Sequence, residues 1–191
     1  MFLFRLLLKA APLLLFFLFS KILKDMLYFR KYLTIPQAIG KNARTEELIS
    51  SLLNLWKESV KASHHFLTES DIHDLIPDVC LALKSVEELV VLHYKNAPAG
   101  FIGIEDKKVE MLFILPDYFG CGFGKRLMDI AIRDYGCIYV DVNEQNPKTR
   151  NFYRHLGFQE YERTEYDEQG RPFPIIKMKL HIQQLSHIAG K

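Results

Sequence analysis

A glycine-rich loop that opens directly onto a basic helix start is the clearest chemical feature of this sequence. The apolar run 109–115 is followed by the loop G-C-G-F-G at 120–124, and Lys125 and Arg126 come next. Glycines allow backbone N–H groups to turn toward a ligand, and the helix dipole favours negative charge at the same point. This arrangement predicts a binding site for a phosphate or pyrophosphate group.

The loop fits neither of two common nucleotide-binding motifs. Its glycines do not follow the G-x-G-x-x-G spacing of dinucleotide-binding folds, and the chain has no G-x-x-x-x-G-K-S/T motif. The segment 119–124 instead resembles the loop of the GNAT superfamily of acetyl-CoA-dependent N-acetyltransferases, which reads Gln/Arg-x-x-Gly-x-Gly/Ala. A second block at 143–158, N-x-x-N followed by FY-x-x-x-GF, resembles the second acetyl-CoA segment of that family.

Two further stretches resemble the YjaB-like bacterial branch of the family, namely 63–67 (SHHFL) and 165–174 (E-x-D-x-x-G-x-P-x-P). The resemblance implies an enzyme that moves the acetyl group of acetyl-CoA directly to a primary amine of a small molecule or a peptide lysine, through a ternary complex. It does not specify the acceptor. The cosubstrate-binding residues that it implies are Phe113, Ile114, Gly120, Cys121, Gly122, Phe123, Gly124, Lys125, Arg126 and Asn146.

Acyl transfer from a thioester to an amine sets three requirements. The amine must be neutral, and a free lysine with a pKa near 10.4 is neutral in only about one molecule per thousand at pH 7. The developing oxyanion needs N–H donors, and the departing thiolate benefits from a nearby acid. The backbone of Phe113 and Ile114 is expected to supply the donors and to pair with the pantetheine arm, if their strand splays from the next.

Three side chains are candidates for the acid and the base. Tyr153 holds the tyrosine position of the FY pair and is expected to protonate the thiolate, although a packed aromatic residue would leave the same pattern. Glu110 is the expected base, with a merely solvated strand residue as the alternative. His64 is expected to act as a base or to orient the substrate, or else to cap a helix.

Position 119 departs from the family, because Phe119 stands where Arg or Gln is usual. Losing a charged hydrogen bond to pyrophosphate costs roughly 1.5–3 kcal/mol, or about ten- to a hundredfold in affinity. We therefore expect weakened rather than absent acetyl-CoA binding. The alternative to an active enzyme is a catalytically weakened acetyl-CoA-binding module, and a loop for another nucleotide is a third hypothesis.

Hydrophobic periodicity and turn signals indicate the elements that must position these residues. Helices are expected from Thr45 and from about Glu69, each followed by apolar residues at helical spacing. Turns at 96–98 and 106–108 separate three strands. The expected strands are 88–94, 99–104, 109–115, 137–142, 158–166 and 174–180, with helices at 123–135 and 147–156. Together with the resemblance, they predict an α+β (three-layer α/β) fold: a GNAT-type mixed, largely antiparallel sheet with helices on both faces.

The first 35 residues do not follow this pattern. The uncharged run 10–20 is too short to span a bilayer, which takes about 20 apolar residues. It resembles a signal-peptide core, but no A-x-A cleavage site follows. Three interpretations stay open: membrane contact by residues 1–24, a signal peptide, or an upstream extension from a wrongly assigned start.

We therefore divide the chain into an extension at 1–35, an N-acetyltransferase domain at 36–181 and a tail at 182–191. The opening of the domain is irregular, because Pro36, Gly40 and Asn42 all disfavour a first strand over 32–42.

Charge and cysteine content limit the partners. Residues 1–35 hold six basic residues and one acidic residue, so the body carries a net charge of −3 within an overall +2. An acidic body lacks the basic footprint of a nucleic-acid-binding protein. The three cysteines have no metal-binding spacing, so we expect no metal and a cytoplasmic enzyme, membrane-associated only if the extension anchors it. Whether it forms a homodimer stays open.

Overall fold

The computed structural model describes residues 33–181, so the expectations for residues 1–24 and for the tail 182–191 lie outside the described part. The first half of that part contains β1 (Thr34–Ala38), η1 (Lys41–Ala43), α2 (Glu46–Ser63), α3 (Glu69–Ser85), β2 (Glu88–Tyr94), β3 (Ala97–Glu105) and β4 (Lys108–Ile114). The second half contains η2 (Pro116–Tyr118), α4 (Phe123–Asp134), β5 (Tyr139–Asn143), α5 (Pro147–His155), β6 (Phe158–Thr164) and β7 (Ile175–Leu180).

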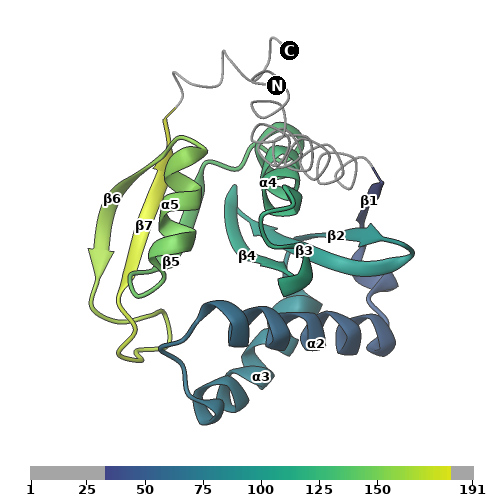
Figure 1. The fold of residues 1–191 in the computed structure, drawn as a ribbon, viewed down its shortest axis with the longest axis horizontal. Coiled ribbons are helices and arrows are strands. Elements are labelled where there is room, and N and C mark those ends of the chain that lie inside the picture. The colour runs from purple at the N-terminus through teal and green to yellow at the C-terminus, as the bar shows by residue number, and fades with distance from the viewer. Residues whose placement is uncertain (1–32, 182–191) are drawn as a thin grey trace, which may run out of the picture.

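One seven-stranded sheet in the order β1-β2-β3-β4-β5-β7-β6 organises these elements. All neighbouring strands are antiparallel except β4 and β5, which run parallel. Helices α2 and α3 cover one face, and α4 and α5 cover the other (Figure 1). The predicted fold class is therefore confirmed, because each face of the sheet buries its own apolar cluster against helices.

Local signals explain where the first two helices begin. Thr45 accepts a hydrogen bond from the Leu48 N–H, and Thr68 forms a capping box with Asp71. Each cap satisfies backbone donors that a helix start leaves without partners. No helix within residues 33–181 is both long enough and apolar enough to cross a membrane.

The first strand forms despite the signals against it. β1 pairs with β2 from Thr34 to Ala38, with Pro36 inside it. It lies at the edge of the sheet, where a residue without an N–H is tolerated because one side of the strand needs no ladder partner. The strand begins two residues before the expected domain boundary at residue 36.

The hairpin turns are shorter than expected. Lys95 and Asn96 have positive φ angles of 53° and 63°, and Asp106 and Lys107 have 46° and 63°. Two consecutive residues with positive φ are the geometry of the tight hairpin turn whose twist matches that of the strands. Residues 97 and 98 therefore belong to β3, and Lys108 begins β4 rather than ending the turn.

Candidate functional site

The two parallel strands separate almost as soon as they pair. β4 and β5 are in register only at Lys108–Tyr139 and Val109–Val140, after which β5 continues its pairing with β7 (Figure 1). The splay on which the expected oxyanion donors depend is therefore present in the fold. We call the space bordered by β4 beyond Val109 and by β5 the β4–β5 opening.

The ladder on the other side of β4 decides which amides face this opening. The Leu115 N–H donates to the Ala99 carbonyl at 2.9 Å, on the β3 side. Hydrogen-bonded and non-bonded pairs alternate along an antiparallel ladder, so the Phe113 N–H also points to β3. The N–H groups of Leu112 and Ile114 point to the opening. Of the two N–H groups expected to face the acetyl oxygen, that of Ile114 points to the opening and that of Phe113 does not. The second N–H group on this side belongs to Leu112.

The glycine loop, residues 119–124, leads from η2 into α4. Gly120 and Gly122 have φ angles of +73° and +83°, which only glycine adopts without strain. Within residues 33–181, five backbone N–H groups of the loop and first helical turn donate to no protein acceptor; they belong to Gly120, Gly122, Phe123, Gly124 and Lys125. Five free donors at the start of a helix make a site suited to an anion.

The side chains around the loop have other contacts. Lys125 pairs with Asp129 at 3.0 Å, and Arg126 donates to the Thr34 hydroxyl on β1. A Cβ at Gly124 would lie 3.4 Å from the Phe152 ring, which is an ordinary van der Waals contact, so α4 begins in contact with α5. Cys121 is buried. The anion site is thus formed by backbone, and the two basic side chains expected to strengthen it bond to protein groups instead.

Tyr153 lies on α5 and is 4% exposed, packed edge-on against Phe158 at 5.8 Å. Burial raises the pKa of its phenol, and the charge of Asp141 on β5 raises it further. Its phenol therefore stays protonated at neutral pH, which is the form that can donate a proton to a leaving group.

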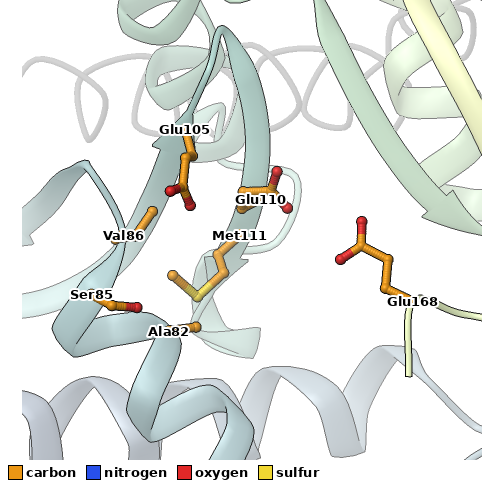
Figure 2. A pocket seen from close by; sticks show the side chains of 7 residues that line it. All are labelled: Ala82, Ser85, Val86, Glu105, Glu110, Met111 and Glu168. Atoms are coloured by element: carbon orange, nitrogen blue, oxygen red, sulfur yellow. The ribbon is translucent and has the colours of Figure 1, made fainter.

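Glu110 is displaced from the regular ladder by a β-bulge. Val109 pairs with Ile104 and Met111 pairs with Gly103, so Glu110 is the extra residue between them. A bulge re-aims a side chain, and here it directs the carboxylate into a pocket of about 210 Å³ on the face that carries α3. The pocket is lined by Ala82, Ser85, Val86, Glu105, Glu110, Met111 and Glu168 (Figure 2).

The charges around Glu110 act in opposite directions. Its side chain is 32% exposed, and burial raises the pKa of its carboxyl. The Lys108 ammonium lies 3.2 Å from Oε1 and lowers the same pKa. Figure 2 shows Glu168, from the loop between β6 and β7, facing Glu110 across the pocket. Its negative charge adds to the upward shift.

His64 follows the last turn of α2, and its ring lies 6.5 Å from that of Phe113 on β4. The Ser63 hydroxyl donates its only proton to the Ser59 carbonyl, so the His64 Nδ1 at 2.8 Å must donate to the Ser63 oxygen. Nε2 is therefore the free acceptor. Glu110 is three residues from Phe113, about 10 Å along the strand, so His64 and Glu110 act at separate points.

We expect His64 to make the stability of the protein pH-dependent. Burial, with a smaller contribution from His65, lowers the pKa of His64 from its ordinary 6.5 to about 4. As the pH falls below 6.5 the unfolded chain takes up a proton that the folded chain refuses, so stability is lost progressively down to about pH 4. The loss between pH 7 and pH 5 should be roughly 1–2 kcal/mol.

Urea unfolding at several pH values measures this dependence. His64→Asn keeps an N–H donor for Ser63 but cannot titrate, so its stability should decline less over that range than that of the wild type. The matched control is His73→Gln, which changes a histidine whose side chain is 84% exposed. Parallel pH curves for the wild type and His64→Asn would contradict the prediction.

Asn146 is 4% exposed at the start of α5. Its side-chain oxygen accepts a hydrogen bond from the Thr149 N–H at 3.1 Å and so caps the helix. The amide nitrogen remains as the donor that a ligand could use. Among residues 33–181 there is no group of three His, Cys, Asp or Glu side chains placed to hold a metal ion.

Comparisons with known proteins agree with this geometry. The acetyltransferase (GNAT) domain family matches residues 85–160. The peptidyl-lysine N-acetyltransferase YjaB of Escherichia coli (strain K12) is 32% identical over 142 residues, which is 73% of this chain and 92% of that protein. The chain belongs to the GNAT acetyltransferases.

Two further comparisons extend the relationship of this GNAT acetyltransferase. The peptidyl-lysine N-acetyltransferase YiaC of the same organism is 28% identical over 137 residues, covering 71% of this chain and 93% of that protein. The solution structure of apo-form YjaB from Escherichia coli superposes with a TM-score of 0.67 and 29% identity, over 76% of this chain and 96% of that chain. The predicted family and branch are confirmed, and with them an N-acetyltransferase that uses acetyl-CoA.

Sequence reasoning did not single out three residues of this GNAT acetyltransferase site. The sequence pattern places Lys108 in a turn, favours Phe113 over its neighbour Leu112, and gives Glu168 only an unspecified position within the segment 165–174. The sequence does carry a signal for Lys108. Residues two positions apart on a strand share a face, so a lysine two residues before Glu110 can pair with it. No local pattern shows which N–H groups of β4 point toward β3 and which point away. Nor does a local pattern show that the β6–β7 loop, with Glu168, lies beside β4.

Proposed function

We propose that this GNAT acetyltransferase binds acetyl-CoA along the β4–β5 opening, with the pyrophosphate on the glycine loop. The observation that carries the proposal is that β4 and β5 stop pairing at Val109. The open edge of β4 beyond that point leads to the five free N–H groups of the loop. A pantetheine arm pairs with such an edge as an added strand would.

The acceptor that we propose is a lysine side chain of a peptide or protein rather than a small amine. Two relatives that cover most of this chain are named peptidyl-lysine N-acetyltransferases. The surroundings of Glu110 support the same class, because three carboxylates and one ammonium meet there and leave an excess of negative charge. Such a field attracts a protonated lysine. We also propose a cytoplasmic location, because acetyl-CoA is available there.

Each proposed side-chain role follows from position and protonation. Glu110 takes a proton from the lysine ammonium, directly or through water, and the neutral amine then attacks the acetyl carbon. The N–H groups of Leu112 and Ile114 stabilise the negative charge on the acetyl oxygen. As the carbon–sulfur bond breaks, Tyr153 gives its proton to the thiolate sulfur, and the second proton that the attacking nitrogen loses on becoming an amide returns to the Tyr153 phenol, directly or through water. His64, with Nε2 free, orients the acceptor beside Phe113, and the Asn146 amide donates to the pantetheine arm.

A thermal-shift titration of the full chain with acetyl-CoA tests binding first. At about a hundred times Kd, binding adds roughly 2.7 kcal/mol to the stability, which is a readily visible shift. We expect this shift with acetyl-CoA and not with ATP or NAD. Thiol release with a lysine peptide, and a mass gain of one acetyl group on that peptide, then test turnover. Binding without thiol release on any amine offered would mean a binding module.

Replacing Phe119 with Arg should increase acetyl-CoA affinity about ten- to a hundredfold, the value of a charged hydrogen bond of roughly 1.5–3 kcal/mol. The Phe119 side chain is 44% exposed at the mouth of the loop, so a longer cation there meets no packed core. The same titration measures the gain, with Tyr166→Arg as a control at an exposed aromatic residue elsewhere. An unchanged Kd in Phe119→Arg would count against the placement of pyrophosphate on this loop.

A further inference from the structure

Lys108 joins three separate elements at the closed end of the β4–β5 opening. Its Nζ lies 3.2 Å from Glu110 on β4, 2.9 Å from Asp141 on β5 and 3.0 Å from Glu168 in the β6–β7 loop. The lysine side chain is 22% exposed, so water screens these contacts less than those of a surface pair. An ammonium has three N–H donors, and three carboxylates stand within ion-pair distance of it, of which Glu168 accepts a hydrogen bond.

The Lys108 ammonium lies at the point of the sheet where the pairing between β4 and β5 ends. Lys108 and Tyr139 form one of the two residue pairs that hold β4 to β5 before the strands separate. Asp141 lies two residues beyond Tyr139, on the strand that borders the opening. The ammonium therefore spans the strands where their backbone pairing ends and ties the β6–β7 loop to the same point.

Lys108 acts as a fixed positive charge rather than as a proton donor or an acetyl acceptor. Its burial lowers its pKa, but hydrogen bonds to Asp141 and Glu168 outweigh that effect and raise it well above the usual range. A lysine held in its ammonium form has no lone pair with which to attack a thioester. What it supplies is a permanent field on the carboxylates around it.

Glu110 needs such a field if it is to work as a base. Around its carboxylate stand Lys108 on its own strand, Asp141 on β5, Glu168 in the β6–β7 loop and Glu105 on β3, so the cation is outnumbered. Burial and like charges both favour a protonated carboxyl, which cannot accept a proton. The ammonium at 3.2 Å is the contact that opposes them.

We propose that Lys108 is a positioning residue for acetyl transfer, which keeps the Glu110 carboxylate ionised and aimed into the pocket beside the β4–β5 opening. This inference rests on the proposed role of Glu110 as the base. It adds that the base works only because a second residue of the same strand, tied to β5 and to the β6–β7 loop, holds it in the ionised form.

Two readouts on Lys108→Met and Lys108→Arg test the inference. The first is the pH titration of the Glu110 side-chain carboxyl by carbon NMR, assigned with Glu110→Gln; the second is the acid limb of the pH profile of kcat/KM. In Lys108→Met both should move upward by roughly one pH unit or more, the effect of an opposite charge within 4–6 Å. Lys108→Arg should stay near the wild type.

Glu168→Gln provides a control of opposite sign. It removes a like charge from the neighbourhood of Glu110, so the carboxyl should titrate at a lower pH than in the wild type. The Glu168 side chain is 71% exposed, so this variant should fold even if Lys108→Met does not. If Lys108→Met does not fold and the Glu110 titration does not move in Glu168→Gln, the charges around Glu110 do not set its ionisation, and the inference is overturned.

The outcomes separate this inference from the proposed function. If Lys108→Met only lowers the melting temperature, while the titration and the acid limb stay in place, the inference is wrong and the proposed function stands. If Glu110→Gln keeps wild-type kcat/KM, Glu110 is not the base and both the proposed mechanism and this inference fall. An inactive Glu110→Gln together with shifted titrations in Lys108→Met supports both.

Discussion

Replacing Tyr153 with Phe should lower kcat by about 10²- to 10⁴-fold, the range of a lost general acid, while acetyl-CoA still binds. The substitution removes only the hydroxyl, and the ring keeps its packing against Phe158. Burial raises the pKa of the phenol, so in the wild type it is protonated whenever the thiolate leaves. Thiol release under saturating substrates measures kcat, and the thermal-shift titration measures binding in the same preparation.

The matched control for this variant is Tyr135→Phe. Tyr135 also packs against the apolar cluster under α4 and α5, but it stands at the end of α4, after Asp134. We expect it to change kcat little, since a single hydroxyl outside the site touches no reacting atom. Equal losses of kcat in the two variants would show that hydroxyl removal perturbs the core rather than the chemistry, and normal turnover by Tyr153→Phe would remove Tyr153 from the mechanism.

Replacing Glu110 with Gln should lower kcat/KM about 10²- to 10⁴-fold at pH 7, because no group then takes the proton from the acceptor lysine. The deficit should shrink as the pH rises toward 10, where an increasing fraction of the free amine is already neutral. In the wild type the acid limb of the profile reports the Glu110 carboxyl, whose pKa burial raises and Lys108 lowers. Stopped assays with a lysine peptide from pH 6 to pH 10 measure both features.

Glu105→Gln is the control for charge alone. It removes the same charge from an exposed residue that lines the same pocket. An exposed charge contributes under about 1 kcal/mol, so its loss should lower kcat/KM by at most about fivefold. A deficit in Glu110→Gln that does not change with pH would argue for a structural or electrostatic role in place of proton transfer.

Most elements of this fold could be predicted from local patterns. Helical spacing after Thr45, with a threonine and two glutamates at the start, predicts α2, and that threonine caps it. The edge strand β1 could not be predicted in this way. Pro36 by itself argues against a strand, but a missing N–H group is tolerated at the edge of a sheet. Edge position depends on strand order, and strand order is not a local property.

Residue types at fixed short spacings are enough to predict the family, the fold class and the positions of the glycine loop and the FY pair. Which groups face the site depends on contacts that form only in the folded chain. Backbone N–H groups alternate in direction along β4, so those of Leu112 and Ile114, rather than that of Phe113, point toward the β4–β5 opening. A bulge aims Glu110, and ion pairs from three elements meet at Lys108. These contacts join residues up to 60 positions apart, and the physical reason is that burial and charge act between groups close in space, whatever their separation along the chain.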